Sequence, residues 1–188
     1  MLPVMFTAVN DAAKSGAIGA RSAILAGAKK GPLGGRMTAF ATAGAGFLLA
    51  VLWFDLMFDV QTRRSKDPIL PPEVLRSISA YYRRVTTDAS PMSRLVAAMM
   101  LVTVVAIGGE IALDRRSIWM PLLSLGLTLC AVGLAGVRTV RNAVRLGRAE
   151  DLARQQSALA RSIFRDHVFC FAAMAGVLAL QLTEAALR

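Results

Sequence analysis

The chain has 188 residues, of which 55% are hydrophobic and only 18% are charged, and its formal net charge is +10. The length predicts one domain, and the composition is too apolar for an ordinary soluble protein. The two cysteines exclude a disulfide framework and a zinc site built from cysteine. In so apolar a chain the basic charge indicates membrane topology, and we expect no nucleic-acid partner.

Residues 1–36 form a basic N-terminal segment in which Asp11 is the only acidic residue. The segment lacks the charged start and the continuous apolar stretch of a secretory signal peptide. It is interpreted as an amphipathic helix lying on the membrane surface, with Ile18, Ile24 and Leu25 facing lipid. The alternatives are a transit-like presequence and a loosely ordered tail.

Four apolar stretches follow, and we expect an all-α fold in which each forms one helix of a four-helix transmembrane bundle over residues 37–188. About 20 helical residues cross a bilayer core of about 30 Å. The second and fourth stretches reach this length only if they include Glu110 and Glu184. An alternative is that these two are buried helices of a soluble bundle. The predicted spans cover about 37–58, 95–113, 117–137 and 168–185.

Small residues recur in the first and fourth spans, as in "AFATAGAGF" at residues 39–47. Lipid gives no hydrophobic drive between helices, so small faces allow close backbone contact instead. We therefore expect a compact bundle that also contacts other membrane protein subunits or a second copy of the chain. The alternative is that the alanine content reflects genome composition alone.

The distribution of lysine and arginine predicts the orientation of the bundle. The two long connections, residues 61–94 and 138–167, carry more basic residues than the opposite side. The positive-inside rule then places both connections in the cytoplasm and both termini outside.

The first long connection contains a predicted helix in "PPEVLRSISAYYRRV", residues 71–85. Pro72 suits the first helical position, and apolar residues recur after it at helical spacing. This predicts a short amphipathic helix on the cytoplasmic membrane surface. The alternative is a helix that docks on a partner protein. The apolar positions are Val74, Leu75, Ile78, Tyr81, Tyr82 and Val85.

The third span is expected to continue as a helix through "VRTVRNAVRLGR", where four arginines share one face. Basic residues close to a membrane attract anionic lipid headgroups, each contributing about 1 kcal/mol. The alternatives for this stripe are ordinary positive-inside bias and a dedicated site for an acidic ligand. The predicted lipid-binding residues of the two connections are Arg76, Arg83, Arg84, Arg141, Arg145 and Arg148.

The first span ends in "WFDLMFDVQTRR", residues 53–64, where two aspartates four residues apart share one helix face. The helix dipole disfavours negative charge at this end, so we expect their partners on other helices. The predicted topology collects the following residues on the same side: Asp55, Asp59, Tyr81, Tyr82, Arg94, Arg138, Arg141, Asp166 and His167. The favoured interpretation is a set of structural ion pairs that lock the bundle end, formed by Asp55, Asp59, Arg63, Arg138 and Arg141.

Ionisable residues inside a membrane are also functional-site candidates, and the candidate catalytic residues are His167, Asp55 and Asp59. Acid–base or oxygen chemistry by His167 with an aspartate is one alternative. A metal site built from the three is chemically possible, but a lone histidine without a Glu-x-x-His pair leads us to predict none. A proton or ion pathway would need polar residues across the membrane, where the middle two spans have only Thr103, Ser124 and Thr128. The sequence specifies no cofactor.

At the opposite end of the bundle Glu110 is expected to pair with Arg115 or Arg116 in a tight turn. Cys130 and Cys170 are expected at depths that differ by about 7 Å, from a rise of about 1.5 Å per residue. This separation is more than a disulfide spans comfortably, so we predict no bond between them.

The order of these parts resembles a family of small four-helix membrane proteins that includes fungal anthrone oxygenases. The matching pieces are Tyr81–Val85, Pro91–Met92, the arginine-rich 138–148 and "RDHVF" at 165–169. That family often has a histidine and a proline near the end of its first span, where this chain has "WFDLMFDVQ", so only His167 is carried over. The resemblance implies a bacterial inner-membrane protein. The basic N-terminus leaves a mitochondrial or plastid inner membrane as the alternative.

The sequence thus predicts an integral membrane protein that acts as an accessory or structural subunit, packing against partner helices and anionic lipid. One alternative is a small membrane enzyme, oxygenase-like, that acts on an apolar substrate at the cytoplasmic end of the bundle. Another is a transporter or a component of an ion pathway. The enzyme interpretation predicts loss of activity in His167→Ala or Asp55→Asn, whereas the subunit interpretation predicts that His167→Ala is tolerated.

Overall fold

The computed structural model describes residues 32–63, 65–88, 90–113 and 118–187, and these ranges contain helices and short connections without a strand. The predicted N-terminal segment therefore lies outside the described residues, except for its last five positions, which open the first long helix. By their contacts, Gly34–Arg188 form one unit, and the description below concerns that unit. The all-α prediction is confirmed for the described part of the chain.

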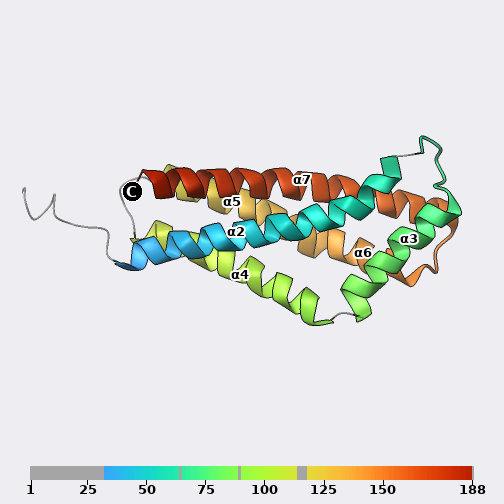
Figure 1. The fold of residues 1–188 in the computed structure, drawn as a ribbon, viewed down its shortest axis with the longest axis horizontal. Helices are drawn as coiled ribbons and strands as arrows, with labels where there is room; N and C mark the ends of the chain where they lie inside the picture. Colours follow the sequence, from blue (N-terminus) through green and yellow to red (C-terminus); the bar gives the residue numbers. More distant parts are fainter. Residues whose placement is uncertain (1–31, 64, 89, 114–117, 188) are drawn as a thin grey trace, which may run out of the picture. The chain divides into compact units, whose positions relative to one another are not determined.

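Four helices are long and apolar enough to cross a membrane, as predicted. In Figure 1 they are α2 (Pro32–Asp59), α4 (Ser90–Leu113), the continuous helix Trp119–Arg148 that begins with α5 (Trp119–Leu134), and α7 (Ala153–Ala186). The main difference from the sequence prediction is α7, which begins at Ala153 instead of residue 168. Its polar first half is helical because one face is small or apolar and packs inside the protein, as Ser157, Ala160 and Ile163 do.

Small side chains fill the core that the four long helices share. On α2, Gly44 lies so close to α4 that a Cβ atom there would collide with the hydroxyl of Thr103. The small residues of the first span thus permit close helix contact at this point, as expected from the sequence. The buried core residues are Ala41, Ala45, Leu48, Ala106, Ile107, Ala131, Cys170, Ala173, Met174 and Val177.

The helices predicted in the two long connections are present. In the first connection α3 (Pro72–Arg83) begins with proline and glutamate and runs into a π-helical turn, η2 (Arg84–Asp88). Beyond α5, a second π-helical turn, η3 (Ala135–Thr139), leads directly into α6 (Val140–Arg148). The predicted continuation of the third span is therefore confirmed.

The apolar face of α3 lies inside the protein, which corrects the expectation that it would face the membrane surface. The chain's own α6 and α7 cover most of this face, while Val74, Tyr81 and Val85 are half-buried. The reason is that both α6 and the first half of α7 offer small and aliphatic side chains at this level. The residues of this second core are Leu70, Leu75, Ile78, Tyr82, Ala143, Leu146, Ala160 and Ile163.

The segment before α3 is held on α7 by polar contacts. The backbone N–H of Leu70 donates to the buried hydroxyl of Ser157 at 2.9 Å. Arg161 donates to the backbone oxygens of Pro68 and Asp67. These bonds fix the start of α3 and hence the position of the tyrosines near its end.

Gly147 marks a close approach of α6 to α3. A Cβ atom there would lie 2.8 Å from the backbone nitrogen of Arg83 and 3.0 Å from its Cα. The backbone of Arg83 cannot adopt another rotamer to make room, as a side chain could. We therefore expect Gly147→Ala to lower the free energy of unfolding by about 1–3 kcal/mol. Denaturant unfolding in mixed micelles measures this change.

Gly133→Ala is the matched control, since a Cβ atom at Gly133 meets open space. In a helix this substitution is neutral or favourable by up to about 1 kcal/mol. Equal unfolding free energies for Gly147→Ala and Gly133→Ala would contradict the close packing of α6 on α3.

Candidate functional site

A buried cluster of acid, histidine and tyrosine lies where α2, α3 and α7 meet. On α7, Nδ1 of His167 is 2.7 Å from Oδ2 of Asp59. The other oxygen of Asp59, Oδ1, accepts a hydrogen bond of 2.6 Å from the hydroxyl of Tyr82. Asp59 is fully buried, so these two partners replace the water that the carboxylate gave up.

The contact with Asp59 determines which nitrogen of His167 is free. Because a carboxylate accepts hydrogen bonds, Nδ1 carries a proton, and Nε2 of the neutral ring then has a lone pair. The nearest acidic oxygen to Nε2 is Oδ2 of Asp55 at 3.9 Å, which is too long for a direct hydrogen bond. Nε2 is therefore available to a proton or to a bound molecule.

A second tyrosine holds the second aspartate. The hydroxyl of Tyr81 donates to Oδ1 of Asp55 at 2.6 Å, and the Phe58 ring stacks on the Tyr81 ring with centroids 4.0 Å apart. Burial, followed by the negative charge of Asp55, raises the pKa of Tyr81. Burial and then the charge of Asp59 raise the pKa of Tyr82. Both hydroxyls therefore stay protonated and act as hydrogen-bond donors at physiological pH.

The cluster forms the polar wall of a cavity of about 440 Å³. A cavity of this size fits a small organic molecule. Asp55, Tyr81, Tyr82 and His167 all line it, whereas the described residues that line it include neither lysine nor arginine. Most of the remaining lining is apolar and includes Val51, Phe54, Val96, Met100, Val140 and Ala143.

The structure gives the predicted ion-pair residues different partners. Nε of Arg138 lies 3.4 Å from Asp166, and Nη2 donates to Ser162 at 2.8 Å, so this arginine contacts α7. Thr139 also lies within 3.4 Å of Asp166. Asp55 and Asp59, expected to pair with Arg138 or Arg141, contact tyrosine and histidine instead. The remaining predicted ion-pair residues are exposed, namely Arg63 and Arg141.

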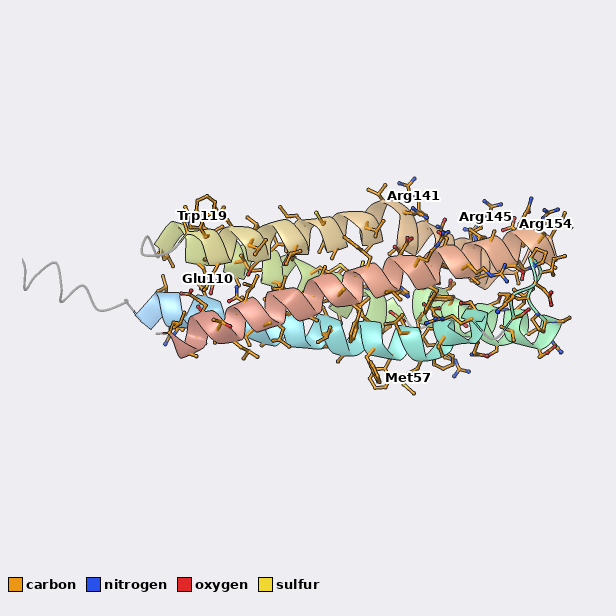
Figure 2. All side chains as sticks on the ribbon, turned by 90° about the horizontal axis from the view of Figure 1, so that it is seen from above. Met57, Glu110, Trp119, Arg141, Arg145 and Arg154 are labelled. Atoms are coloured by element: carbon orange, nitrogen blue, oxygen red, sulfur yellow. The ribbon has the colours of Figure 1, made fainter. Side chains whose placement is uncertain are left out.

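The six arginines predicted to bind lipid are all exposed, and Figure 2 shows Arg141 and Arg145 toward the same end as Arg154, away from Glu110. Two of them lie against acidic residues of the same chain, and Nε of Arg83 is 3.9 Å from Asp88. Nε and Nη2 of Arg145 each donate to Asp151 at 2.7 Å, and this hydrogen bonding lowers the pKa of Asp151. Their contact with lipid stays a prediction.

At the other end of the long helices Glu110 is buried between α2, α4 and α7. It accepts hydrogen bonds from the hydroxyl of Thr38 and from Nε2 of Gln181, the latter at 3.0 Å. Its expected partners, Arg115 and Arg116, lie outside the described residues. Glu110 therefore belongs to a polar contact inside the helices, a role that the sequence did not indicate.

Between the two ends the predicted polar positions are buried. Thr103 and Thr128 donate to backbone oxygens of their own helices at 2.7 Å, and the hydroxyl of Ser124 is buried as well. The two cysteines, Cys130 and Cys170, are both free, as predicted.

Within the described ranges no three His, Cys, Asp or Glu side chains are grouped so that they could hold a metal ion. In the candidate trio, Nδ1 of His167 and a carboxylate oxygen of Asp59 already bind each other. No protein-family model, curated protein sequence or solved structure matches the chain.

Proposed function

We propose that the chain is an integral membrane protein whose four long helices form a transmembrane bundle, and that the cavity binds an apolar small molecule. His167 exchanges a proton with that molecule. The observation that supports this most strongly is the imidazole of a cavity-lining histidine, fixed by Asp59 and left with one free ring nitrogen. Positive-inside bias places this end in the cytoplasm, and we propose a bacterial inner membrane as the location.

The arrangement supports general acid–base chemistry. The unprotonated Nε2 takes a proton from an acidic group of the bound molecule, and Asp59 stabilises the imidazolium that forms. The hydroxyl of Tyr82 holds Asp59 in place, and most of the cavity lining around His167 is apolar. A positioned base of this kind contributes about 10²–10⁴-fold to a rate.

The resemblance to the family that includes anthrone oxygenases supports one version of this proposal. In that version the molecule is an apolar substrate, and removal of its proton by His167 starts an oxygenase-like reaction. The same resemblance carries over only His167, so Asp55, Asp59 and the tyrosines belong to the proposal on geometry alone.

A second candidate function is that of an accessory subunit that packs against partner helices and anionic lipid. The observation that favours it is an open face of small residues on α5 and η3, which continue into α6 with its exposed arginines. A Cβ atom would meet open space at each of the glycines Gly126, Gly133 and Gly136. Small faces of this kind allow close contact with another membrane helix.

The first test of the proposed function is to fill the cavity. Ala97 of α4 lines the cavity and the neighbouring Ala98 does not, although both side chains are exposed. Wild-type protein extracted in lipid nanodiscs should carry an apolar molecule that mass spectrometry detects above empty nanodiscs. We expect Ala97→Trp to lose this molecule and Ala98→Trp to retain it.

Equal content in Ala97→Trp and Ala98→Trp would contradict binding in the cavity. A wild-type protein that carries no such molecule and binds no added apolar probe would contradict it as well. Co-purification of a stoichiometric partner protein with both variants would favour the subunit function.

A further inference from the structure

We propose that the molecule taken by the cavity is a lipophilic cation, the protonated form of an apolar amine, which binds beside Asp55 in exchange for a proton. This inference deepens the proposed function and rests on it, because it names the class of molecule that the same cavity binds. Two observations support it: the charges of the cluster do not balance, and Oδ2 of Asp55 can accept a hydrogen bond from a bound cation.

The ionisable groups of the cavity wall do not balance when all are charged. Asp55 and Asp59 supply two negative charges, and His167, neutral while Nε2 is unprotonated, supplies at most one positive charge when it takes up a proton. Asp166 on α7 has its own counter-charge in Arg138, at 3.4 Å. An uncompensated charge that is largely removed from water is unfavourable, so the wall needs at least one more positive charge.

The phenols on α3 do not change this balance, since Tyr81 and Tyr82 remain neutral donors. The described lining residues also lack lysine and arginine. A proton supplies the missing charge while the cavity is empty. A cationic molecule supplies it when the cavity is filled, and the proton then leaves.

Asp55 is the carboxylate that such a cation reaches. Both oxygens of Asp59 are occupied, Oδ1 by Tyr82 and Oδ2 by His167, and its side chain is fully buried. Asp55 accepts one direct hydrogen bond, at Oδ1 from Tyr81, while Oδ2 lies 3.9 Å from Nε2 of His167 and the side chain keeps 16% exposure. Oδ2 of Asp55 therefore has accepting capacity on the cavity side.

The rest of the lining suits a bulky cation more than an anion. Phe54 and Tyr81 provide aromatic rings, whose faces attract positive charge. Met92 and Met100 are flexible and polarisable, so they adapt to apolar groups of different shape. An anion would meet a carboxylate without a basic side chain to bind it.

The test uses three probes of similar bulk and different charge. Tetraphenylphosphonium is the cation, tetraphenylborate the anion and triphenylmethane the neutral probe. Binding is measured by equilibrium dialysis against the full chain in nanodiscs of zwitterionic lipid, after subtraction of empty nanodiscs. We expect the phosphonium to bind saturably and at least about tenfold more tightly than the borate, as one uncompensated charge requires.

The second arm is the pH dependence. If one proton leaves for each cation bound, the affinity for phosphonium falls by up to about tenfold per pH unit as the pH is lowered. We expect Asp55→Asn to lose phosphonium binding and its pH dependence, and Asp55→Glu to retain both. Glu110→Gln alters a buried carboxyl at the far end and should behave as wild type.

The outcomes separate this inference from the proposed function. If triphenylmethane binds and phosphonium binds no better, or if the affinity for phosphonium does not change with pH, the cation inference is wrong and the apolar cavity stands. If none of the probes binds the wild-type protein, the proposed function is wrong as well. Phosphonium binding that survives in Asp55→Asn would overturn the assignment to Asp55.

Discussion

Replacement of Asp59 by alanine is expected to lower the free energy of unfolding by about 1–3 kcal/mol for each of the two buried donors that lose their acceptor. Both oxygens of this carboxylate are used, at 2.6 Å from Tyr82 and at 2.7 Å from His167. Asp59→Ala leaves a buried hydroxyl and a buried ring N–H without an acceptor. Denaturant titration in mixed micelles, followed by circular dichroism, measures the loss.

Asp55→Ala is the matched control four residues earlier on the same helix. Asp55 keeps some exposure and accepts one short hydrogen bond, from Tyr81, so its loss should cost only about 0.5–1.5 kcal/mol. Tyr82→Phe combined with Asp59→Ala should cost less than the sum of the two single changes, because they break the same bond. Equal costs for Asp59→Ala and Asp55→Ala would contradict the central position of Asp59.

A second large effect is expected at the other end of the helices. Glu110 is fully buried and holds Thr38 and Gln181, so Glu110→Ala should cost about 1–3 kcal/mol for each polar group left without its acceptor. Because this cluster lies apart from the cavity, occupancy of the cavity should not change. Denaturant unfolding measures the loss of stability in Glu110→Ala, and mass spectrometry of the purified variant measures how much of the bound molecule it retains.

Thr38→Val and Gln181→Leu test whether these groups depend on Glu110. In the Glu110→Ala background each should cost less than in wild type, since its partner is already gone. Loss of the bound molecule in a folded Glu110→Ala protein would show that the two ends of the helices are coupled, against this account.

The apolar runs made the four long helices predictable, because a bilayer requires about 20 apolar residues in each span. The same criterion missed the first half of α7. Residues 153–166 are mostly polar, yet Ala160 and Ile163 recur on one face and fit against α3 and α6. Helix packing inside the protein, which hydropathy does not record, determines where α7 begins.

Membrane topology also predicted that Asp55, Asp59 and His167 would lie at one end. It could not predict their partners, because adjacent side chains on a helix point about 100° apart. Tyr81 and Tyr82 therefore point in different directions, their ring planes are inclined by 71°, and they bind Asp55 and Asp59 respectively. The pair "YY" was the one feature of the sequence that could have indicated these hydrogen-bond partners. It was interpreted as part of the apolar face of an amphipathic helix.

The cavity itself had no sequence signature. Its lining comes from seven elements, α2, α3, η2, α4, η3, α6 and α7. Apolar residues such as Val96 and Met100 look like ordinary lipid-facing or core positions in the sequence. Only the way in which α3 and α6 pack against the long helices leaves a space among them.

The central claim is that Asp59 holds His167 with Nε2 free toward a bound molecule, and the chain has only this one histidine. Nitrogen-15 NMR of histidine-labelled protein in nanodiscs therefore reports on His167 alone. We expect a neutral ring protonated at Nδ1, with an Nε2 signal that shifts when the cavity is filled and a tautomer preference that is lost in Asp59→Asn. A ring protonated at Nε2, or one averaging both tautomers as in water, would contradict the account.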